Sequence, residues 1–179
     1  MKAGGWKERA RKICLLLLDV DGVLTDGKIG IDGSGGEIKF FDIRDGHGIK
    51  LFQRGGLEVG ILSGRAARAV RVRARELGIQ LVRQKALDKG RVLEEILRLK
   101  RVHPEQVCYV GDDLVDLPVF FRVGLAVAVA DGVEDLKRHA HYITRNPGGR
   151  GAVREICEQI LKAQGKWDGA TRRYFPPFR

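Results

Sequence analysis

Cysteine is scarce in this chain of 179 residues. The three cysteines, Cys14, Cys108 and Cys157, are an odd number, lie far apart in the sequence and stand among apolar neighbours. This spacing fits neither a disulfide framework nor a zinc-ligand pattern. We therefore expect free thiols in the core of a protein from a reducing compartment.

Long apolar runs are also missing. The longest, at residues 13–18, is far shorter than the roughly 20 residues that cross a bilayer. Basic residues precede this run, as in a signal peptide, but it leads into Asp19 and Asp21 with no small-residue cleavage site. We expect neither a membrane span nor a secretory leader, and hence a cytoplasmic protein.

The composition is that of a folded protein with an excess of positive charge. Hydrophobic residues make up 44% and charged residues 31%, which excludes a disordered or collagen-like chain. The net charge of +10 favours anionic partners, which include nucleic acid, an acidic membrane surface and a phosphorylated or carboxylated small molecule. Charge alone does not choose among them.

Strand and helix patterns alternate along the chain, which predicts an α/β fold with a doubly wound, Rossmann-like parallel sheet and helices on both faces. A glycine-rich joint at residues 32–36 predicts a small β-hairpin at about 27–42. We expect one domain over residues 1–164 and a C-terminal tail over residues 165–179, either disordered or folded over a site. The expected strands are 13–20, 57–62, 80–82, 107–110, 125–129 and 141–143, and the expected helices are 48–54, 66–77, 88–100, 114–122, 133–139 and 152–163.

Acidic residues stand where two apolar strands are expected to end. Asp19 and Asp21 are two residues apart, which points them to the same side of an extended chain. Asp112 and Asp113 close another apolar strand, and Asp116 follows about one helical turn later. Ligands of doubly wound sheets bind at the carboxyl ends of the strands, and clustered carboxylate oxygens suit Mg²⁺. The pattern predicts a magnesium site.

Two further polar residues occupy equivalent places. Ser63 stands at the end of a strand and just before a helix, a position that favours phosphate binding. Lys89 begins the helix that follows Asp88. Single residues of these types are common, but the order Asp-x-Asp, Ser, Lys, Gly-Asp-Asp at successive element ends is not.

On these residues the chain resembles the haloacid dehalogenase-like phosphohydrolase superfamily, whose four motifs match DVDG at residues 19–22, Ser63, Lys89 and GDDLVD at residues 111–116. Longer strings resemble a small group of sugar-acid phosphatases within it. One departure is Lys85, which stands where this group usually has glycine. The longer strings are DVDGVLTDG (19–27), DGHGIKL (45–51), LSGR (62–65) followed by Arg73, GDDLVDLPV (111–119), GGRGAVREICEQIL (148–161) and AQGKW (163–167).

The resemblance implies a reaction through an aspartyl phosphate. Asp19 is then the nucleophile, and Asp21 protonates the leaving sugar oxygen and later deprotonates water. Asp19, Asp112 and the backbone carbonyl of Asp21 are the implied Mg²⁺ ligands. Asp113 and Asp116 support the ion's water shell and orient Lys89. The implied phosphate- and substrate-binding residues are Ser63, Gly64, Arg65, Arg73 and Lys89, of which Arg65 and Arg73 are expected to recognise the sugar acid's carboxylate.

The intervals between motifs are too short for a cap domain, with 43 residues between Asp19 and Ser63 and 25 between Ser63 and Lys89. The resemblance therefore implies an open site, a homotetramer joined by its hairpins, and a neighbouring subunit that closes each site. His47, between two glycines, is expected in a flexible loop that could face the site. The implied substrate is the 8-phosphate of an eight-carbon sugar acid, in lipopolysaccharide precursor synthesis, with no nucleic acid or membrane partner.

Three alternatives remain open. One is a phosphatase for a nine-carbon sialic-type sugar acid 9-phosphate, which only a substrate panel separates from the first. A receiver-type signalling domain also gathers carboxylates and a lysine, but its phosphoacceptor aspartate ends a middle strand, where this chain has Ser63. A basic nucleic-acid-binding protein would leave the acidic cluster without a role.

Overall fold

The computed structural model describes residues 5–175, and its centre is a six-stranded sheet in which every neighbouring pair runs parallel. The strand order is β5-β4-β1-β6-β7-β8, so the chain starts in the middle, winds to one edge and then to the other. This confirms the doubly wound sheet. The strands are β1 (Leu15–Leu18), β4 (Glu58–Leu62), β5 (Leu81–Arg83), β6 (Val107–Gly111), β7 (Leu125–Ala128) and β8 (Tyr142–Ile143).

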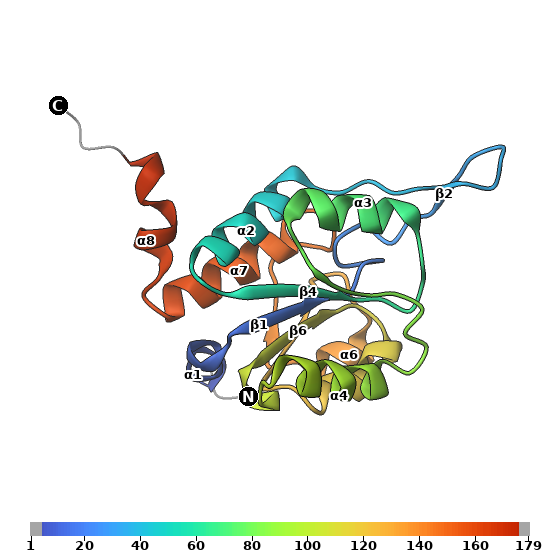
Figure 1. Ribbon diagram of the computed structural model, residues 1–179. Helices are drawn as coiled ribbons and strands as arrows, with labels where there is room; N and C mark the ends of the chain where they lie inside the picture. The colour runs from blue at the N-terminus through green and yellow to red at the C-terminus, as the bar shows by residue number, and fades with distance from the viewer. Residues whose placement is uncertain (1–4, 176–179) are drawn as a thin grey trace.

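Helices cover both faces of the sheet, with α2, α3 and α7 on one face and α4 and α6 on the other (Figure 1). The helix from about 114 to 122 is divided into a 3-10 turn, η2, and the short helix α5. The helices are α1 (Gly5–Lys12), α2 (Ile43–Arg54), α3 (Arg68–Leu77), α4 (Lys89–Lys100), α5 (Leu117–Phe120), α6 (Glu134–Lys137), α7 (Ala152–Ala163) and α8 (Trp167–Thr171), with 3-10 turns η1 (Pro104–Gln106), η2 (Leu114–Asp116) and η3 (Arg172–Tyr174).

The central strand β1 shows why the apolar run at its position is continuous. Its four leucines are all buried, because successive side chains point to opposite faces and both faces are covered. Leu16 and Leu18 pack into the core under α2 and α7. Leu15 and Leu17 pack into the core on the α4 side. Burial of each leucine contributes about 1.5–3 kcal/mol to folding, and together they fix the end of β1 relative to both layers.

The expected hairpin is present as β2 (Gly30–Ile31) and β3 (Glu37–Ile38), which pair antiparallel and project from the body of the molecule (Figure 1). The Asp32 carboxylate fixes its turn by accepting the backbone N–H groups of Ser34 at 2.8 Å and Gly36 at 2.7 Å. Between Asp19 and Ser63, within the described residues, the chain adds only this hairpin, α2 and β4. No cap domain is inserted there.

Helix α2 begins earlier than the sequence suggests. Its N-cap is Asp42, whose carboxylate accepts the N–H of Arg44 at 2.6 Å and of Asp45 at 3.4 Å. The expectation that His47 lies in a flexible loop is therefore wrong, because His47 is in the second turn of this helix. Gly46 and Gly48 each cost a helix about 1 kcal/mol, but the cap and the packing of α2 outweigh that cost.

Two terminal helices were not expected. Helix α1 precedes β1, and α8 with η3 occupies much of the segment assigned to the tail, which is therefore ordered over residues 167–174. Helix α8 lies beside the C-terminal part of α7, far from the hairpin (Figure 1). Residues 176–179 of the tail lie outside the described residues. Within residues 5–175, no helix combines the length and apolar character needed to span a bilayer.

Candidate active site

Three of the predicted motifs lie together at the C-terminal ends of three adjacent strands. Asp19 directly follows β1, Ser63 follows β4 and Asp112 follows β6, and these strands are neighbours in the order β4-β1-β6. All three residues line a cavity of about 390 Å³, together with Lys89. The remaining predicted residues on its wall are Asp21, Gly64, Arg65 and Asp113.

Lys89 is the buried cation of the site. Its Nζ contacts Asp19 Oδ2 at 2.5 Å and Asp116 Oδ1 at 2.6 Å, and it donates to the hydroxyl of Tyr109 at 3.2 Å. Asp88 places it by capping α4 through the N–H of Arg91. Burial alone would lower the pKa of Lys89, but the charges of Asp19 and Asp116 raise it above its usual value. Lys89 is therefore a fixed positive charge beside Asp19.

Asp116 orients its surroundings. It is fully buried, and its Oδ2 accepts the backbone N–H groups of Asp112 at 2.9 Å and Asp113 at 3.3 Å. Its Oδ1 accepts the hydroxyl of Tyr109 at 2.6 Å and is held by Lys89. The Asp113 side chain accepts the N–H of Leu114 at 2.6 Å, which starts η2.

Negative charge exceeds positive charge around Asp19 and Asp112. Burial, followed by the neighbouring charges of Asp116 and Asp19, raises the pKa of Asp112 to about 8. Burial also raises the pKa of Asp19 to about 6, although Lys89 opposes the shift and Asp116 adds to it. A further cation would stabilise the ionised form of these buried carboxylates, whose pKa values are raised.

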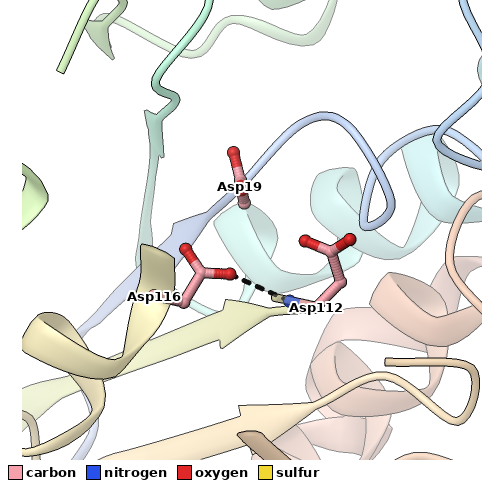
Figure 2. Close-up of side chains that lie close together, drawn as sticks. All are labelled: Asp19, Asp112 and Asp116. Atoms are coloured by element: carbon pink, nitrogen blue, oxygen red, sulfur yellow. Dashed lines mark hydrogen bonds between the residues drawn. The ribbon is translucent and has the colours of Figure 1, made fainter. Parts of the chain in front are cut away.

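A divalent cation fits this cluster. Asp19, Asp112 and Asp116 each offer a carboxylate oxygen, and these oxygens lie within 4.8 Å of one another. Figure 2 shows the three side chains grouped at the ends of the strands, with the bond from the Asp112 N–H to Asp116. Each Asp116 oxygen already accepts from two donors, whereas each Asp19 oxygen accepts from one, so Asp19 and Asp112 are the better candidates for direct ligands.

The glycine after Asp21 is required by this arrangement. Gly22 has a φ of +83°, and a Cβ placed on it would lie 2.0 Å from Oδ2 of Asp112. Any side chain at this position would displace the Asp112 carboxylate from the cavity.

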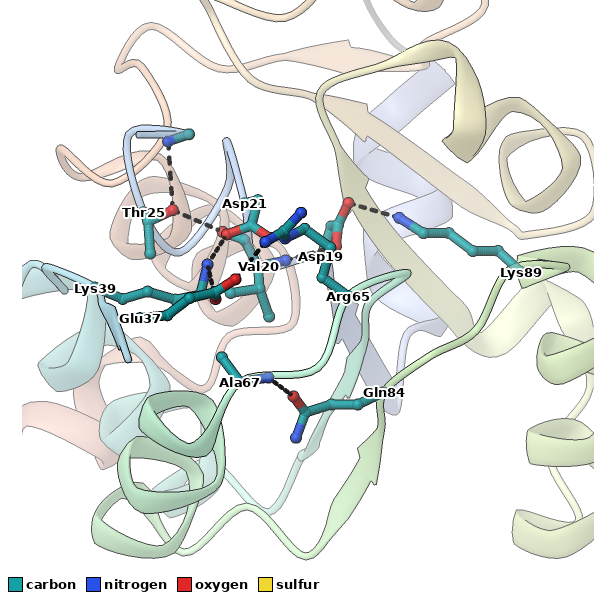
Figure 3. A network of polar contacts seen from close by, with 11 residues as sticks. Asp19, Val20, Asp21, Thr25, Glu37, Lys39, Arg65, Ala67, Gln84 and Lys89 are labelled. Carbon is teal, nitrogen blue, oxygen red and sulfur yellow. Dashed lines mark hydrogen bonds and ion pairs between the residues drawn. The ribbon is translucent and has the colours of Figure 1, made fainter. Parts of the chain in front are cut away.

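A second charged network, which the sequence analysis missed, surrounds Asp21. Lys39, from the chain just after β3, has a side chain that is only 1% exposed and forms an ion pair with Asp21 (Figure 3). Its Nζ also lies 3.5 Å from Oε2 of Glu37. Arg65 pairs with Glu37, and its Nε is 3.7 Å from Oδ2 of Asp21. Glu37 and Lys39 are two residues apart in an extended segment, so their side chains point to the same side, but the sequence does not show that Asp21 lies on that side.

The two expected carboxylate-binding arginines occupy different places. Arg65 lines the cavity of Asp19, whereas Arg73 lies over the ring of Phe41, 5.9 Å from its centre, in an adjacent pocket between α3 and the hairpin. His47 faces away from both, since its ring contacts the hydroxyl of Tyr174 at 2.8 Å and the guanidinium of Arg154 at 3.0 Å.

Lys85, which departs from the glycine expected at this position, adopts a backbone conformation that favours glycine. Its φ is +59°, in the left-handed region. With this loop between β5 and α4, Lys89 lines the cavity.

Comparison with known proteins agrees with this geometry. A family model described as haloacid dehalogenase-like hydrolase matches residues 81–156. The 3-deoxy-D-manno-octulosonate 8-phosphate phosphatase of Yersinia pestis is 49% identical over 164 residues, which is 92% of this chain and 88% of the relative.

Solved structures are equally similar. The crystal structure of the Yersinia pestis phosphatase superposes with a TM-score of 0.91 at 47% identity, over 93% of this chain and 90% of that one. The enzyme of the same name from Moraxella catarrhalis, in complex with a magnesium ion, a phosphate ion and a KDO molecule, has a TM-score of 0.93 at 36% identity, over 96% and 99%. The chain thus belongs to the haloacid dehalogenase-like hydrolases and, within them, to the family of 3-deoxy-D-manno-octulosonate 8-phosphate phosphatases.

Proposed function

We propose that this chain hydrolyses 3-deoxy-D-manno-octulosonate 8-phosphate to the free sugar acid and phosphate in a Mg²⁺-dependent reaction, as a step of lipopolysaccharide precursor synthesis. The observation that carries the proposal is the convergence of Asp19, Lys89, Asp112 and Ser63 on one cavity. The relatives that carry this activity in their names match almost the whole chain.

Asp19 is the nucleophile of the proposed mechanism. One carboxylate oxygen forms a bond to phosphorus while the bond from phosphorus to the sugar oxygen breaks, which leaves an aspartyl phosphate. Val20 N–H donates to Asp19 Oδ1 at 2.7 Å and Lys89 holds Oδ2, so the carboxylate is oriented before substrate arrives. Asp19, Asp112 and the backbone carbonyl of Asp21 would hold Mg²⁺, which would supply positive charge to offset the repulsion between carboxylate and phosphate.

Asp21 transfers the protons. It donates a proton to the departing sugar oxygen and then accepts one from the water that attacks phosphorus, which frees Asp19 and releases phosphate. Lys39 fixes the direction of its carboxylate. Ser63, which is buried at the end of β4, and the Gly64 backbone bind the phosphoryl oxygens.

Arg65 binds the substrate's carboxylate in this proposal. It is half exposed on the cavity wall and presents a guanidinium, whose planar fork matches a carboxylate. Arg73 is placed to contribute from the adjacent pocket, or to serve a neighbouring copy.

The proposed assembly is a homotetramer in which a neighbouring subunit completes each site. Apolar side chains are exposed at the rim of the cavity, where Leu87 is 94% and Val115 62% accessible. Others lie along the hairpin and after it, with Ile31, Phe40 and Ile43 between 72% and 83% exposed. Contacts between copies would bury both sets. We also propose a cytoplasmic location, since the three cysteines are free thiols.

A substrate panel tests the function. Phosphate release is measured from 3-deoxy-D-manno-octulosonate 8-phosphate, from a nine-carbon sialic-type acid 9-phosphate and from simple sugar phosphates, each with Mg²⁺ and with EDTA. The expected result is EDTA-sensitive release that is fastest with the eight-carbon acid. Faster release from the nine-carbon acid would overturn the substrate assignment, and no metal-dependent release from any of them would overturn the function.

A further inference from the structure

Two sequence strings outside the catalytic cluster, DGHG at residues 45–48 and GGRG at residues 148–151, meet in a buried junction. Asp45, in the first turn of α2, is 1% exposed. Its carboxylate accepts the backbone N–H of Arg154 at 2.7 Å and of Gly151 at 3.2 Å. Both donors belong to the start of α7, whose N-cap, Gly151, has no side chain to cap it. Asp45 therefore caps α7 from a neighbouring helix.

The second glycine of the DGHG string brings the two helices close enough for this contact. A Cβ on Gly48 would lie 2.8 Å from Cα of Arg154, so only glycine allows α2 and α7 to approach this closely. Burial raises the pKa of Asp45 to about 6, so both of its oxygens are acceptors at pH 7.5. The capping contact is short, buried and charged.

The loop before α7 lies against the turn that follows Asp21. The N–H of Gly149 donates to the carbonyl of Val23 at 2.8 Å. A Cβ on Gly148 would lie 1.7 Å from the carbonyl oxygen of Gly22, and one on Gly149 would lie 2.4 Å from the carbonyl carbon of Thr25. The backbone of Gly148 and Gly149 thus packs directly against the backbone of this turn, with no room for a side chain between them.

From these contacts we infer that Asp45 is a positioning residue for the reaction. By anchoring the start of α7, it holds the glycine loop against the turn after Asp21, which fixes the Asp21 carboxylate relative to Asp19. The inference rests on the proposed function, since it assigns Asp45 a part in that reaction. It explains why both glycine-containing strings accompany the catalytic motifs in this chain.

The test compares two variants at the N-terminus of α2. Asp45→Ala removes the cap of α7, and Asp42→Ala removes the cap of α2 itself without touching α7. Each lost cap destabilises the fold, so both variants are assayed well below their unfolding temperatures, with circular dichroism as a check of folding. Asp45→Asn, which keeps one accepting oxygen, provides a milder variant if Asp45→Ala does not fold.

The readout is the activity toward two substrates that differ in their leaving group. A displaced Asp21 impairs proton donation, which a sugar leaving group needs and the acidic nitrophenol of p-nitrophenyl phosphate does not. Because the later hydrolysis of the aspartyl phosphate also uses Asp21 and is common to both substrates, the comparison uses kcat/KM, which reports the steps up to departure of the leaving group. We expect kcat/KM for the sugar phosphate to fall about tenfold or more in Asp45→Ala, with kcat/KM for p-nitrophenyl phosphate nearly unchanged. Asp45→Asn should lie between this variant and the parent, and Asp42→Ala should match the parent.

An equal loss of kcat/KM on both substrates, or an unchanged kcat/KM for the sugar phosphate, would overturn the inference. Either result is distinct from failure of the proposed function, in which the parent protein itself releases no phosphate from the sugar acid phosphate.

Discussion

Tyr109 offers a sharp test of the network that holds Lys89. Its ring is completely buried in β6, and its hydroxyl donates to Asp116 Oδ1 at 2.6 Å while accepting from Lys89 Nζ at 3.2 Å. Tyr109→Phe removes that oxygen and leaves the ring packed edge-on against Phe120. Asp116 keeps Lys89 and two backbone donors, so the network is weakened rather than abolished.

The magnitude follows from the charge on Asp116. A buried hydrogen bond to a charged group contributes about 1.5–3 kcal/mol to the free energy of unfolding. In a domain of this size each kcal/mol shifts Tm by about 2–4 °C, so Tm should fall by about 3–12 °C. Because Lys89 loses one of its three partners, we expect kcat to fall about tenfold with little change in KM. Thermal unfolding and phosphate release measure the two effects.

Tyr142→Phe is the matched control. The Tyr142 hydroxyl donates to Glu155 Oε1 at 2.6 Å, which is also a bond to a carboxylate, but it lies in edge strand β8, away from the cavity. This variant should lose stability and keep the kcat of the parent within about twofold. A Tyr109→Phe protein that is destabilised but turns over substrate at the parent rate would refute the assigned role of the hydroxyl.

Three further predictions concern the site and its loop. Asp19→Asn should reduce phosphate release about 10³-fold or more in a steady-state assay, since the amide is a poor nucleophile; a variant that keeps a tenth of the activity would contradict the nucleophile assignment. Because the pKa of Asp112 is raised to about 8 without metal, Mg²⁺ binding must displace a proton below that pH; the affinity measured by calorimetry should rise about tenfold per pH unit from 6.5 to 7.5, and a flat profile would contradict this. Lys85→Gly should raise the free energy of unfolding in urea by about 0.5–1 kcal/mol, because the left-handed backbone strains lysine more than glycine's extra chain entropy costs; a loss of stability would count against it.

The sequence predicted the parts of the site that lie at strand ends. Asp19, Ser63 and Asp112 could be placed together because parallel strands end at one edge and the apolar runs before them were unmistakable. Lys39 could not be placed, since its role depends on how the hairpin folds back over Asp21, which no local pattern states. The sequence did not single out Tyr109, because its ring packs in the core like that of any buried aromatic residue and only its hydroxyl takes part in the site.

Helix α2 shows a second limit of local patterns. Two glycines within four residues normally interrupt a helix, and for this reason the sequence predicted that the helix starts only at residue 48. In the folded protein, Arg73 packs so closely against Gly46, and α7 against Gly48, that neither position has room for a side chain. Tertiary contacts of this kind decide the structure of Asp45–Gly48, and they are invisible until the helices are packed.

The central claim is that Asp19 becomes phosphorylated beside a divalent cation held by carboxylates from separate strands. A crystal structure of the protein with Mg²⁺ and beryllium trifluoride, which mimics a phosphoryl group on aspartate, tests it most directly. We predict the fluoride adduct on Asp19, with the ion contacting both Asp19 and Asp112. An adduct on another residue, or an ion bound away from Asp112, would contradict the account.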